Sequence, residues 1–119
     1  MKISFIGAGN MAGAIIGAIL NSGRTLPEEI CVYDKLSEKC EAFSAKGVHC
    51  AATLKEAVEL SPWVLIAVKP QDMESVLTSV KNDCSGFAAK TYISIAAGIS
   101  TGYIERILGK CAVVRVMPN

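Results

Sequence analysis

A glycine-rich turn near the amino terminus has the residue types and the spacing of a phosphate-binding loop. The motif GAGNMAG at positions 7–13 follows the apolar run 3–6 and precedes a second apolar run. Gly7 permits a sharp turn, Gly9 allows a pyrophosphate to approach the backbone, and the small Ala12 lets the following helix lie against the strand. The N–H groups and the dipole at the start of that helix would attract the phosphates. The motif therefore predicts a dinucleotide-binding turn between a strand and a helix.

An acidic residue follows at the distance that such turns require. Asp34 comes directly after the strand-like run 30–33 and lies 21 residues beyond Gly13, close to the roughly 20 expected. Its carboxylate would accept a hydrogen bond from a ribose 2′-hydroxyl and repel a 2′-phosphate, which favours NADH. Lys35, Ser37 and Lys39 follow closely and could reverse that preference, and Asp34 could instead cap a loop or a helix. The sequence therefore allows both NADP(H) and NAD(H).

Strand and helix patterns alternate along the rest of the chain. Strands are predicted over residues 3–6, 30–33, 48–51, 63–68, 91–95 and 112–117, from apolar runs bounded by turn residues. Helices are predicted after the glycine turn and over residues 37–46, 71–81 and 100–108, with a further short helix between Thr53 and Pro62. Thr53 and Glu56 are expected to form a capping box at the start of that short helix.

This alternation is typical of a parallel sheet with right-handed crossovers. The predicted fold class is therefore α/β, a Rossmann-type doubly wound parallel sheet of about six strands with helices on both faces. Ligands of such sheets bind at the carboxyl ends of the strands, where residues 7–11, 68–70, 96–98 and 118–119 should emerge. Lys69 is the charged side chain at the centre of this group, as either a cofactor contact or a solvated lysine.

Several side chains have a structural explanation that competes with a role in binding. Met11 and Met73 are expected to fill the core. Gly13 and Gly17 are expected to mark close packing of the first helix on the sheet. Arg115 lies within an apolar strand, where a charge needs a partner, so it is expected to form an edge or structural ion pair or to contact the substrate.

Composition bounds the class of protein. At 119 residues the chain fits one domain, 1–119, and its 51% hydrophobic content argues against disorder. The balance of 12 Lys and Arg against 11 Asp and Glu, without runs of one sign, suggests neither nucleic acid nor membrane as a partner. Five cysteines without a Cys-x-x-Cys motif argue against disulfides or zinc and favour a reducing cytoplasm. The single histidine, His49, lacks neighbouring ligands, so it is expected to be structural or exposed and no metal site is expected.

The apolar amino terminus could also be a secretory signal or a membrane helix. Gly7, Gly9 and Asn10 interrupt the apolar segment, and no clear cleavage site follows it. Its unbroken part also falls short of the roughly 20 residues that span a bilayer. A first strand and helix is therefore the preferred interpretation.

Four motifs occur in order along the whole chain: FIGAGNMA at 5–12, AVKPQ at 67–71, SIAAGI at 94–99 and RVMPN at 115–119. Together they resemble the amino-terminal domain of the pyrroline-5-carboxylate reductases, which reduce 1-pyrroline-5-carboxylate to proline with NAD(P)H. The resemblance implies that residues 6–11 hold the pyrophosphate, that 67–70 border the cofactor, and that 96–98 lie by the nicotinamide. With Asp34 and Lys35 from the loop after the second strand, the predicted cofactor-binding residues are Ile6, Gly7, Ala8, Gly9, Asn10, Met11, Asp34, Lys35, Ala67, Val68, Lys69, Pro70, Ala96, Ala97 and Gly98. The resemblance also implies that Asn119 lies beside the reacting ring.

The chemistry that the resemblance implies is hydride transfer from C4 of a dihydronicotinamide to the carbon of a cyclic C=N bond, without a catalytic metal. Family members continue past the position of Asn119 into a helical domain that forms a homo-oligomer and supplies most imine-binding residues. The chain is therefore expected to bind NAD(P)H but to turn over 1-pyrroline-5-carboxylate poorly. Leu54 departs from the pattern, because some relatives have a polar cofactor contact at its place.

Two other functions would share the glycine turn and the sheet. One is the cofactor domain of a related β-hydroxyacid dehydrogenase, against which the motifs at 67–71 and 115–119 argue. The other is a dinucleotide-sensing domain without hydride chemistry, which would not need a platform of small residues at 96–98. Fold alone does not separate these functions.

Overall fold

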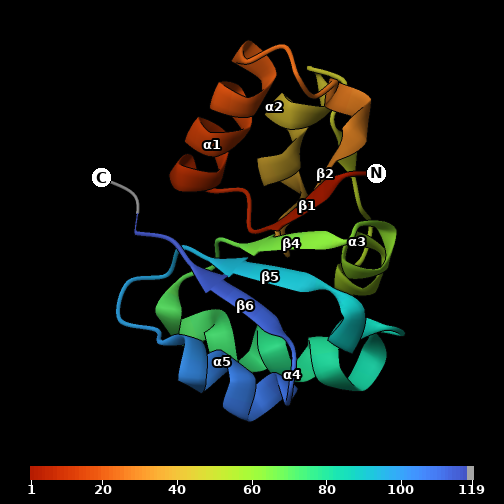
Figure 1. Ribbon diagram of the computed structural model, residues 1–119. Helices are drawn as coiled ribbons and strands as arrows, with labels where there is room; N and C mark the ends of the chain where they lie inside the picture. Colours follow the sequence, from red (N-terminus) through yellow and green to blue (C-terminus); the bar gives the residue numbers. More distant parts are fainter. Residues whose placement is uncertain (118–119) are drawn as a thin grey trace.

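Six parallel strands form one sheet in the computed structural model, which describes residues 1–117 of the chain (Figure 1). The strands are β1 (Ile3–Ile6), β2 (Ile30–Tyr33), β3 (His49–Cys50), β4 (Trp63–Ile66), β5 (Thr91–Ser94) and β6 (Ala112–Arg115). Their order is β3-β2-β1-β4-β5-β6, and every neighbouring pair runs parallel. The order changes direction between β1 and β4, as in doubly wound folds that bind dinucleotides. The predicted α/β class and Rossmann-type sheet are confirmed.

Helices cover both faces of this sheet. They are α1 (Asn10–Asn21), α2 (Glu41–Ser44), α3 (Leu54–Leu60), α4 (Met73–Asp83) and α5 (Thr101–Leu108). Short 3₁₀ turns occur at Pro27–Glu29, Ser37–Cys40, Pro70–Asp72 and Phe87–Ala89. Helices α1 and α2 pack on one face, whereas α3, α4 and α5 pack on the other (Figure 1). The two layers confirm the prediction of helices on both faces.

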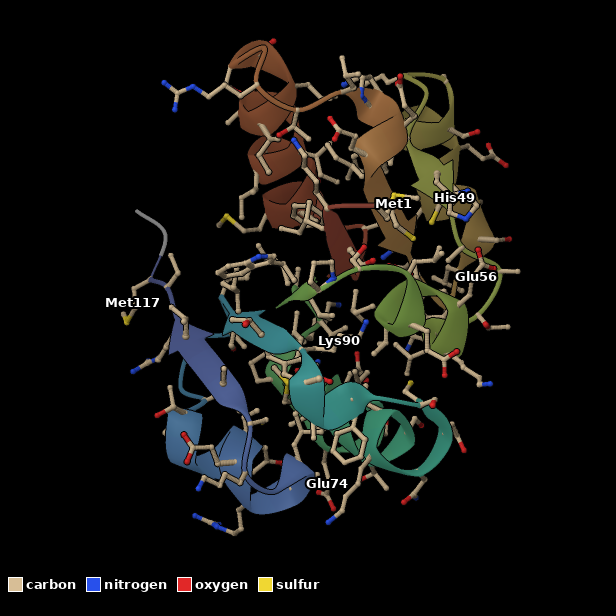
Figure 2. The ribbon with its side chains drawn as sticks, turned by 45° about the vertical axis from the view of Figure 1, so that its right-hand side comes forward. Met1, His49, Glu56, Glu74, Lys90 and Met117 are labelled. Atoms are coloured by element: carbon tan, nitrogen blue, oxygen red, sulfur yellow. The ribbon has the colours of Figure 1, made fainter. Side chains whose placement is uncertain are left out.

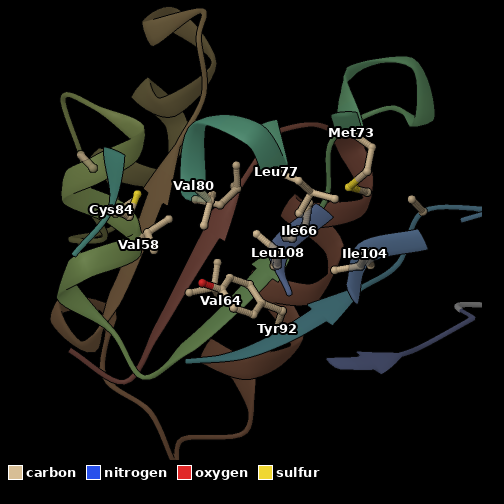
Figure 3. Close-up of a cluster of buried hydrophobic side chains, with 14 of the residues drawn as sticks. Val58, Val64, Ile66, Met73, Leu77, Val80, Cys84, Tyr92, Ile104 and Leu108 are labelled. Carbon is tan, nitrogen blue, oxygen red and sulfur yellow. The ribbon is translucent and has the colours of Figure 1, made fainter. Parts of the chain in front are cut away.

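The central strand β4 contributes side chains to both layers. Val64 and Ile66 belong to the core cluster that includes α4 and α5, whereas Leu65 belongs to the cluster that includes α1. All three side chains are at most 5% exposed, as expected for a parallel strand that is covered on both faces. Figure 3 shows Leu77 of α4 and Ile104 of α5 in the first of these clusters.

Two hydrogen bonds satisfy hydroxyl groups of buried residues. The Tyr92 hydroxyl donates a hydrogen bond to the carbonyl of Phe87 at 2.7 Å, and burial raises the pKa of this phenol. The Ser4 hydroxyl of β1 donates to the Ser61 hydroxyl at the end of α3, also at 2.7 Å. Both serines are fully buried, so each satisfies a polar group that water does not reach. Met73 is fully buried as well, which confirms it as a core residue.

Most element bounds differ slightly from the sequence prediction. Strands β1 and β2 match, whereas the other four are shorter, because apolar runs extend beyond the residues that pair across the sheet. The predicted helix 37–46 is a 3₁₀ turn followed by the short α2, and Gly47, with a φ of 90°, follows it. Helix α4 begins after the 3₁₀ turn at Pro70–Asp72 and extends to Asp83, two residues beyond the predicted end.

Three expectations about packing are wrong. Met11 is 45% exposed, because it lies on the solvent side of the first turn of α1. A Cβ at Gly17 would meet no heavy atom within 4 Å, and a Cβ at Gly13 would lie 3.5 Å from the ring of Phe43 in α2 rather than against the sheet. Arg115 is exposed on β6, one of the two edge strands of the sheet, and its expected contact with the substrate stays a prediction.

Three further expectations concern the carboxyl terminus, membrane-spanning helices and the cysteines. Pro118 and Asn119 lie outside the described residues, so the predicted place of Asn119 beside the reacting ring stays a prediction. Within residues 1–117, no helix combines the length and the apolar character that crossing a bilayer requires. All five cysteines are unpaired thiols in this structure.

Candidate functional site

A cavity of about 390 Å³ opens at the carboxyl ends of β1, β2 and β4. Its wall combines the glycine turn after β1, the loop after β2, and the connection from β4 into α4. Small-molecule sites typically have volumes of about 300–1,000 Å³. In open α/β sheets they lie where the strand order changes direction, as it does here. This cavity is therefore the candidate functional site.

The structure brings together most, but not all, of the predicted site residues. The lining residues among them are Ile6, Gly7, Ala8, Gly9, Asp34, Lys35, Ala67, Val68 and Lys69. Asn10, Met11, Pro70, Ala96, Ala97 and Gly98 lie outside the cavity wall. Lys39 and Leu54, which the sequence analysis noted, also line it. Lining residues that no motif indicated are Tyr33, Leu36, Asp72, Ser75, Val76 and Ser79. The last four of these recur at the three- and four-residue spacing of one helix face, a signal that could have identified them.

Gly7 lies in close contact with the backbone that follows the neighbouring strand β4. Its φ is 106°, and a Cβ built on it would lie 2.7 Å from the carbonyl oxygen of Ala67. The N–H of Gly7 donates to the carbonyl of Tyr33 at 2.7 Å, which extends the pairing of β1 with β2 by one residue. The backbone segments after β1, β2 and β4 thus meet at a position that no side chain fits.

Gly9 stands at the start of α1 with open space beside it. It is the N-cap residue, its φ of −81° and ψ of −168° suit any residue, and no side chain caps the helix there. A Cβ at Gly9 would meet no heavy atom within 4 Å. The first turn of α1 carries no acidic residue of its own. Such a helix start can bind an anionic group through its N–H groups.

Asp34 joins two of the loops that form the cavity. Its Oδ2 atom accepts a hydrogen bond from the backbone N–H of Ala8 at 2.9 Å. Its Oδ1 atom accepts one from the N–H of Leu36, also at 2.9 Å. The carboxylate therefore lies beside the glycine turn, and both of its oxygens already bind backbone groups.

Charged side chains of both signs surround the cavity. Lys35 Nζ lies 3.8 Å from Asp72 Oδ1, so this ion pair connects the loop after β2 with the 3₁₀ turn before α4. Lys35 is 72% exposed in this pair, and an exposed ion pair contributes little stability. Lys39 and Lys69 line the cavity as further cations. The wall thus combines three lysines with two acids, a mixture that suits a ligand carrying phosphate groups.

Apolar side chains form another part of the wall. Leu54 of α3 and Val76 of α4 pack against the core cluster beneath the cavity. Leu36 is 44% exposed at the loop after β2. A second cavity, of about 700 Å³, shares Tyr33, Leu54 and Ser79 with the first. Apolar walls beside a few polar groups are typical of sites that bind small molecules and cofactors.

The segment after β5 leaves the sheet outside this cavity. Ala96 is 7% exposed within the core, whereas Ala97 and Gly98 are exposed, and Gly98 has a φ of 77°. Because β5 runs parallel to β4, residues 96–98 emerge at the same edge of the sheet as the cavity. A ligand that used both regions would extend along this edge.

His49 of β3 belongs to a separate surface contact with α3. Its Nε2 lies 2.6 Å from Glu56 Oε2, and Figure 2 labels both residues. The Thr53 hydroxyl accepts from the N–H of Glu56 at 3.1 Å, as the predicted capping box requires. The other half of the box differs, because Glu56 Oε1 accepts from Ala52 rather than from Thr53. The His49 and Ala52 contacts hold the pKa of Glu56 below its usual value.

Comparison with known proteins identifies relatives over the whole chain. The family model described as NADP oxidoreductase, coenzyme F420-dependent, matches residues 2–98. The pyrroline-5-carboxylate reductase of Escherichia coli (strain K12) is 35% identical over 120 residues, which cover 99% of this chain and 44% of that protein. The chain therefore spans less than half the length of this relative.

Solved structures give the same result. A pyrroline-5-carboxylate reductase from Coxiella burnetii superposes with a TM-score of 0.89 at 35% identity, covering 99% of this chain and 44% of that one. The Plasmodium falciparum pyrroline carboxylate reductase with NADP bound has a TM-score of 0.84 at 26% identity, covering 100% of this chain and 42% of that one. The resemblance that the four motifs indicate is confirmed.

Proposed function

We propose that this chain, which belongs to the family of coenzyme F420-dependent NADP oxidoreductases, provides the NADP(H)- or NAD(H)-binding site of a pyrroline-5-carboxylate reductase. The observation that carries the proposal is the geometry of the glycine turn. Gly7 closes against Ala67, whereas Gly9 leaves open space beside the uncapped start of α1. A dinucleotide needs this combination, because its pyrophosphate must approach the backbone at a helix start.

The residues at the cavity fit the parts of such a cofactor. The N–H groups at the start of α1, which Asn10 and Met11 provide, would hold the pyrophosphate. Asp34 and Lys39 stand where the loop after β2 would meet the ribose and any 2′-phosphate. Leu54 and Val76 offer apolar walls for a base. We assign the nicotinamide half to residues 67–70 and 96–98 and to Asn119, following the resemblance.

The proposed reaction is the reduction of 1-pyrroline-5-carboxylate to proline. When bound, the reduced nicotinamide supplies a hydride to the C=N bond of this cyclic imine. The chain's own contribution is to bind and orient the cofactor through backbone N–H groups, and to shape one wall of the reaction site with small residues such as Ala97. The names of the relatives support this reaction over the β-hydroxyacid dehydrogenase alternative.

We further propose that the chain binds cofactor but turns over the imine poorly by itself. Support comes from its 44% share of the length of the Escherichia coli relative. Apolar side chains also stand exposed along and after β6, where Val114, Val116 and Met117 are 46%, 45% and 68% exposed. A reducing, cytoplasmic location and a homo-oligomeric whole protein are part of the same proposal.

A two-stage assay tests both parts. NADPH or NADH fluorescence should change saturably when the purified chain is added. Adding 1-pyrroline-5-carboxylate should then oxidise the cofactor far more slowly than an equal concentration of the Escherichia coli enzyme does. Turnover near that of the full-length relative would contradict the proposal that the chain alone reduces the imine poorly. A lack of cofactor binding would contradict the proposed site.

A further inference from the structure

The side chain of Asp34 links the glycine turn after β1 to the loop after β2. Ile6 pairs with Tyr33 in the last register position of the two strands. The N–H of Gly7 then donates to the carbonyl of Tyr33 at 2.7 Å. One residue later, the N–H of Ala8 donates to Oδ2 of Asp34 at 2.9 Å. The carboxylate thus adds a side-chain bond between the glycine turn and the loop after β2.

The second oxygen of the same carboxylate fixes the other loop. Oδ1 of Asp34 accepts from the N–H of Leu36 at 2.9 Å. Ala8 belongs to the glycine turn and Leu36 to the loop after β2, and both residues line the cavity. One side chain therefore sets the position of two backbone segments that form the cavity wall.

The Ala8 N–H depends on the Asp34 carboxylate as its hydrogen-bond acceptor. Ala8 is 8% exposed, so water has little access to replace a lost bond. A buried N–H without a partner is costly, and a bond to an ionised carboxylate is among the stronger hydrogen bonds in proteins. Removing the carboxylate should therefore disturb the turn between Gly7 and Gly9, where the pyrophosphate would approach.

We propose that Asp34 is a positioning residue that holds the glycine turn in its binding geometry, and that it does not select between NADH and NADPH. The inference rests on the proposed dinucleotide site. In the usual arrangement an acid at this position binds the ribose 2′-hydroxyl, so its loss weakens NADH binding and relieves repulsion of the 2′-phosphate of NADPH. A positioning role has a different signature, because both cofactors carry the same pyrophosphate.

The first test uses the unaltered chain without ligand. A long-range HNCO experiment detects scalar coupling across a hydrogen bond, here from the Ala8 amide nitrogen to the Asp34 carboxylate carbon. We expect this coupling and slow exchange of the Ala8 amide proton with solvent. Fast exchange of that proton, at the rate of an open loop, would overturn the proposal without the need for any variant.

The second test compares matched variants by calorimetric titration with NADPH and with NADH. Asp34→Asn keeps the shape of the side chain but retains an acceptor for only one of the two N–H groups. Asp72→Asn is the control, because it removes a negative charge from the same cavity wall while its recorded side-chain contact is the exposed ion pair with Lys35. Circular dichroism confirms that each variant is folded.

Asp34→Asn should weaken the binding of both NADH and NADPH by a similar factor of about ten. The reason is that a charge-assisted hydrogen bond contributes roughly a factor of ten or more to an equilibrium constant. Its Ala8 amide should also exchange faster than in Asp72→Asn. Weaker NADH binding with unchanged or tighter NADPH binding would overturn the inference and leave the dinucleotide site intact. If the unaltered chain binds neither cofactor, the proposed function fails, and this inference fails with it.

Discussion

Replacing Gly7 with alanine should destabilise the fold strongly, whereas the same replacement at Gly9 should not. The two glycines lie two residues apart in one turn, and each change adds one methyl group. They differ in backbone conformation, because Gly7 has a φ of 106° and Gly9 a φ of −81°. They also differ in what the added methyl group meets.

The cost at Gly7 has two parts. Holding an alanine at this positive φ costs about 1–3 kcal/mol. The new Cβ would also lie 2.7 Å from the oxygen and 2.9 Å from the carbon of the Ala67 carbonyl. Ala67 cannot retreat freely, because its N–H donates to the carbonyl of Ile6 at 2.8 Å. Overpacking of this kind adds about 1–3 kcal/mol, for a total of roughly 2–6 kcal/mol.

At Gly9 neither part applies. The φ and ψ of this residue are allowed for alanine, and no heavy atom lies within 4 Å of the new Cβ. Alanine is a poorer N-cap than glycine, which lowers stability. It also lowers the conformational entropy of the unfolded chain, which raises stability by a similar amount of free energy. The net change should therefore stay within about 1 kcal/mol.

Urea unfolding followed by circular dichroism measures both changes. Gly7→Ala should lower the free energy of unfolding by several kcal/mol, a large share of the roughly 5–15 kcal/mol typical of a domain. The free energy of unfolding of Gly9→Ala should stay within about 1 kcal/mol of that of the unaltered chain. Equal losses in the two variants, or no loss in Gly7→Ala, would refute the reasoning about the turn.

Three further predictions concern contacts away from the cavity. Thr53→Ala removes the N-cap acceptor of α3 and should cost about 1 kcal/mol of stability in urea unfolding. Contacts from His49 and Ala52 hold the pKa of Glu56 below its usual 4.5, so its contribution to stability is present above that pH and lost as the pH falls through the lower folded value. Glu56→Gln should therefore flatten the acid limb of a stability profile, and an unchanged profile would contradict this. Ser4→Ala and Ser61→Ala should each cost about 1–3 kcal/mol by leaving a buried hydroxyl unpaired, but together less than the sum, as a double-mutant cycle would show.

The sequence predicts the order of the elements well because the relevant signals are local. An apolar run followed by glycines and a second apolar run has few other solutions than strand, turn and helix. Strand β2 between Glu29 and Asp34 is equally well bounded, and its predicted and observed limits agree. The strand order then follows from general topology rules rather than from any single residue.

Features that depend on long-range contacts are predicted less well. Met11 is apolar and near the glycine turn, but its exposure depends on which way α1 rotates over the sheet. Arg115 lies in an apolar run, but β6 is an edge strand, and the sequence does not reveal which strand forms the edge. Glu56 reaches Ala52 and His49 because β3 ends nearby, a contact that the Thr-x-x-Glu pattern does not contain.

The candidate site contains both features that local sequence predicts and features that depend on long-range contacts. The motif predicts a sharp turn at Gly7 and an accessible backbone at Gly9, and the structure has a positive φ at Gly7 and open space beside Gly9. Asp34 is recognisable from its distance to the glycines, but its bonds to Ala8 and Leu36 emerge only from the structure. The contribution of α4, through residues such as Val76, depends on the orientation of that helix.

The most direct test of the proposed function is a calorimetric titration of the chain with NADPH, repeated on Gly9→Ala. The unaltered chain should bind with a stoichiometry near one. The variant should remain folded and bind much more weakly, because its methyl group occupies the space beside the start of α1. No binding to the unaltered, folded chain, or equal binding to both proteins, would contradict a dinucleotide site at this turn.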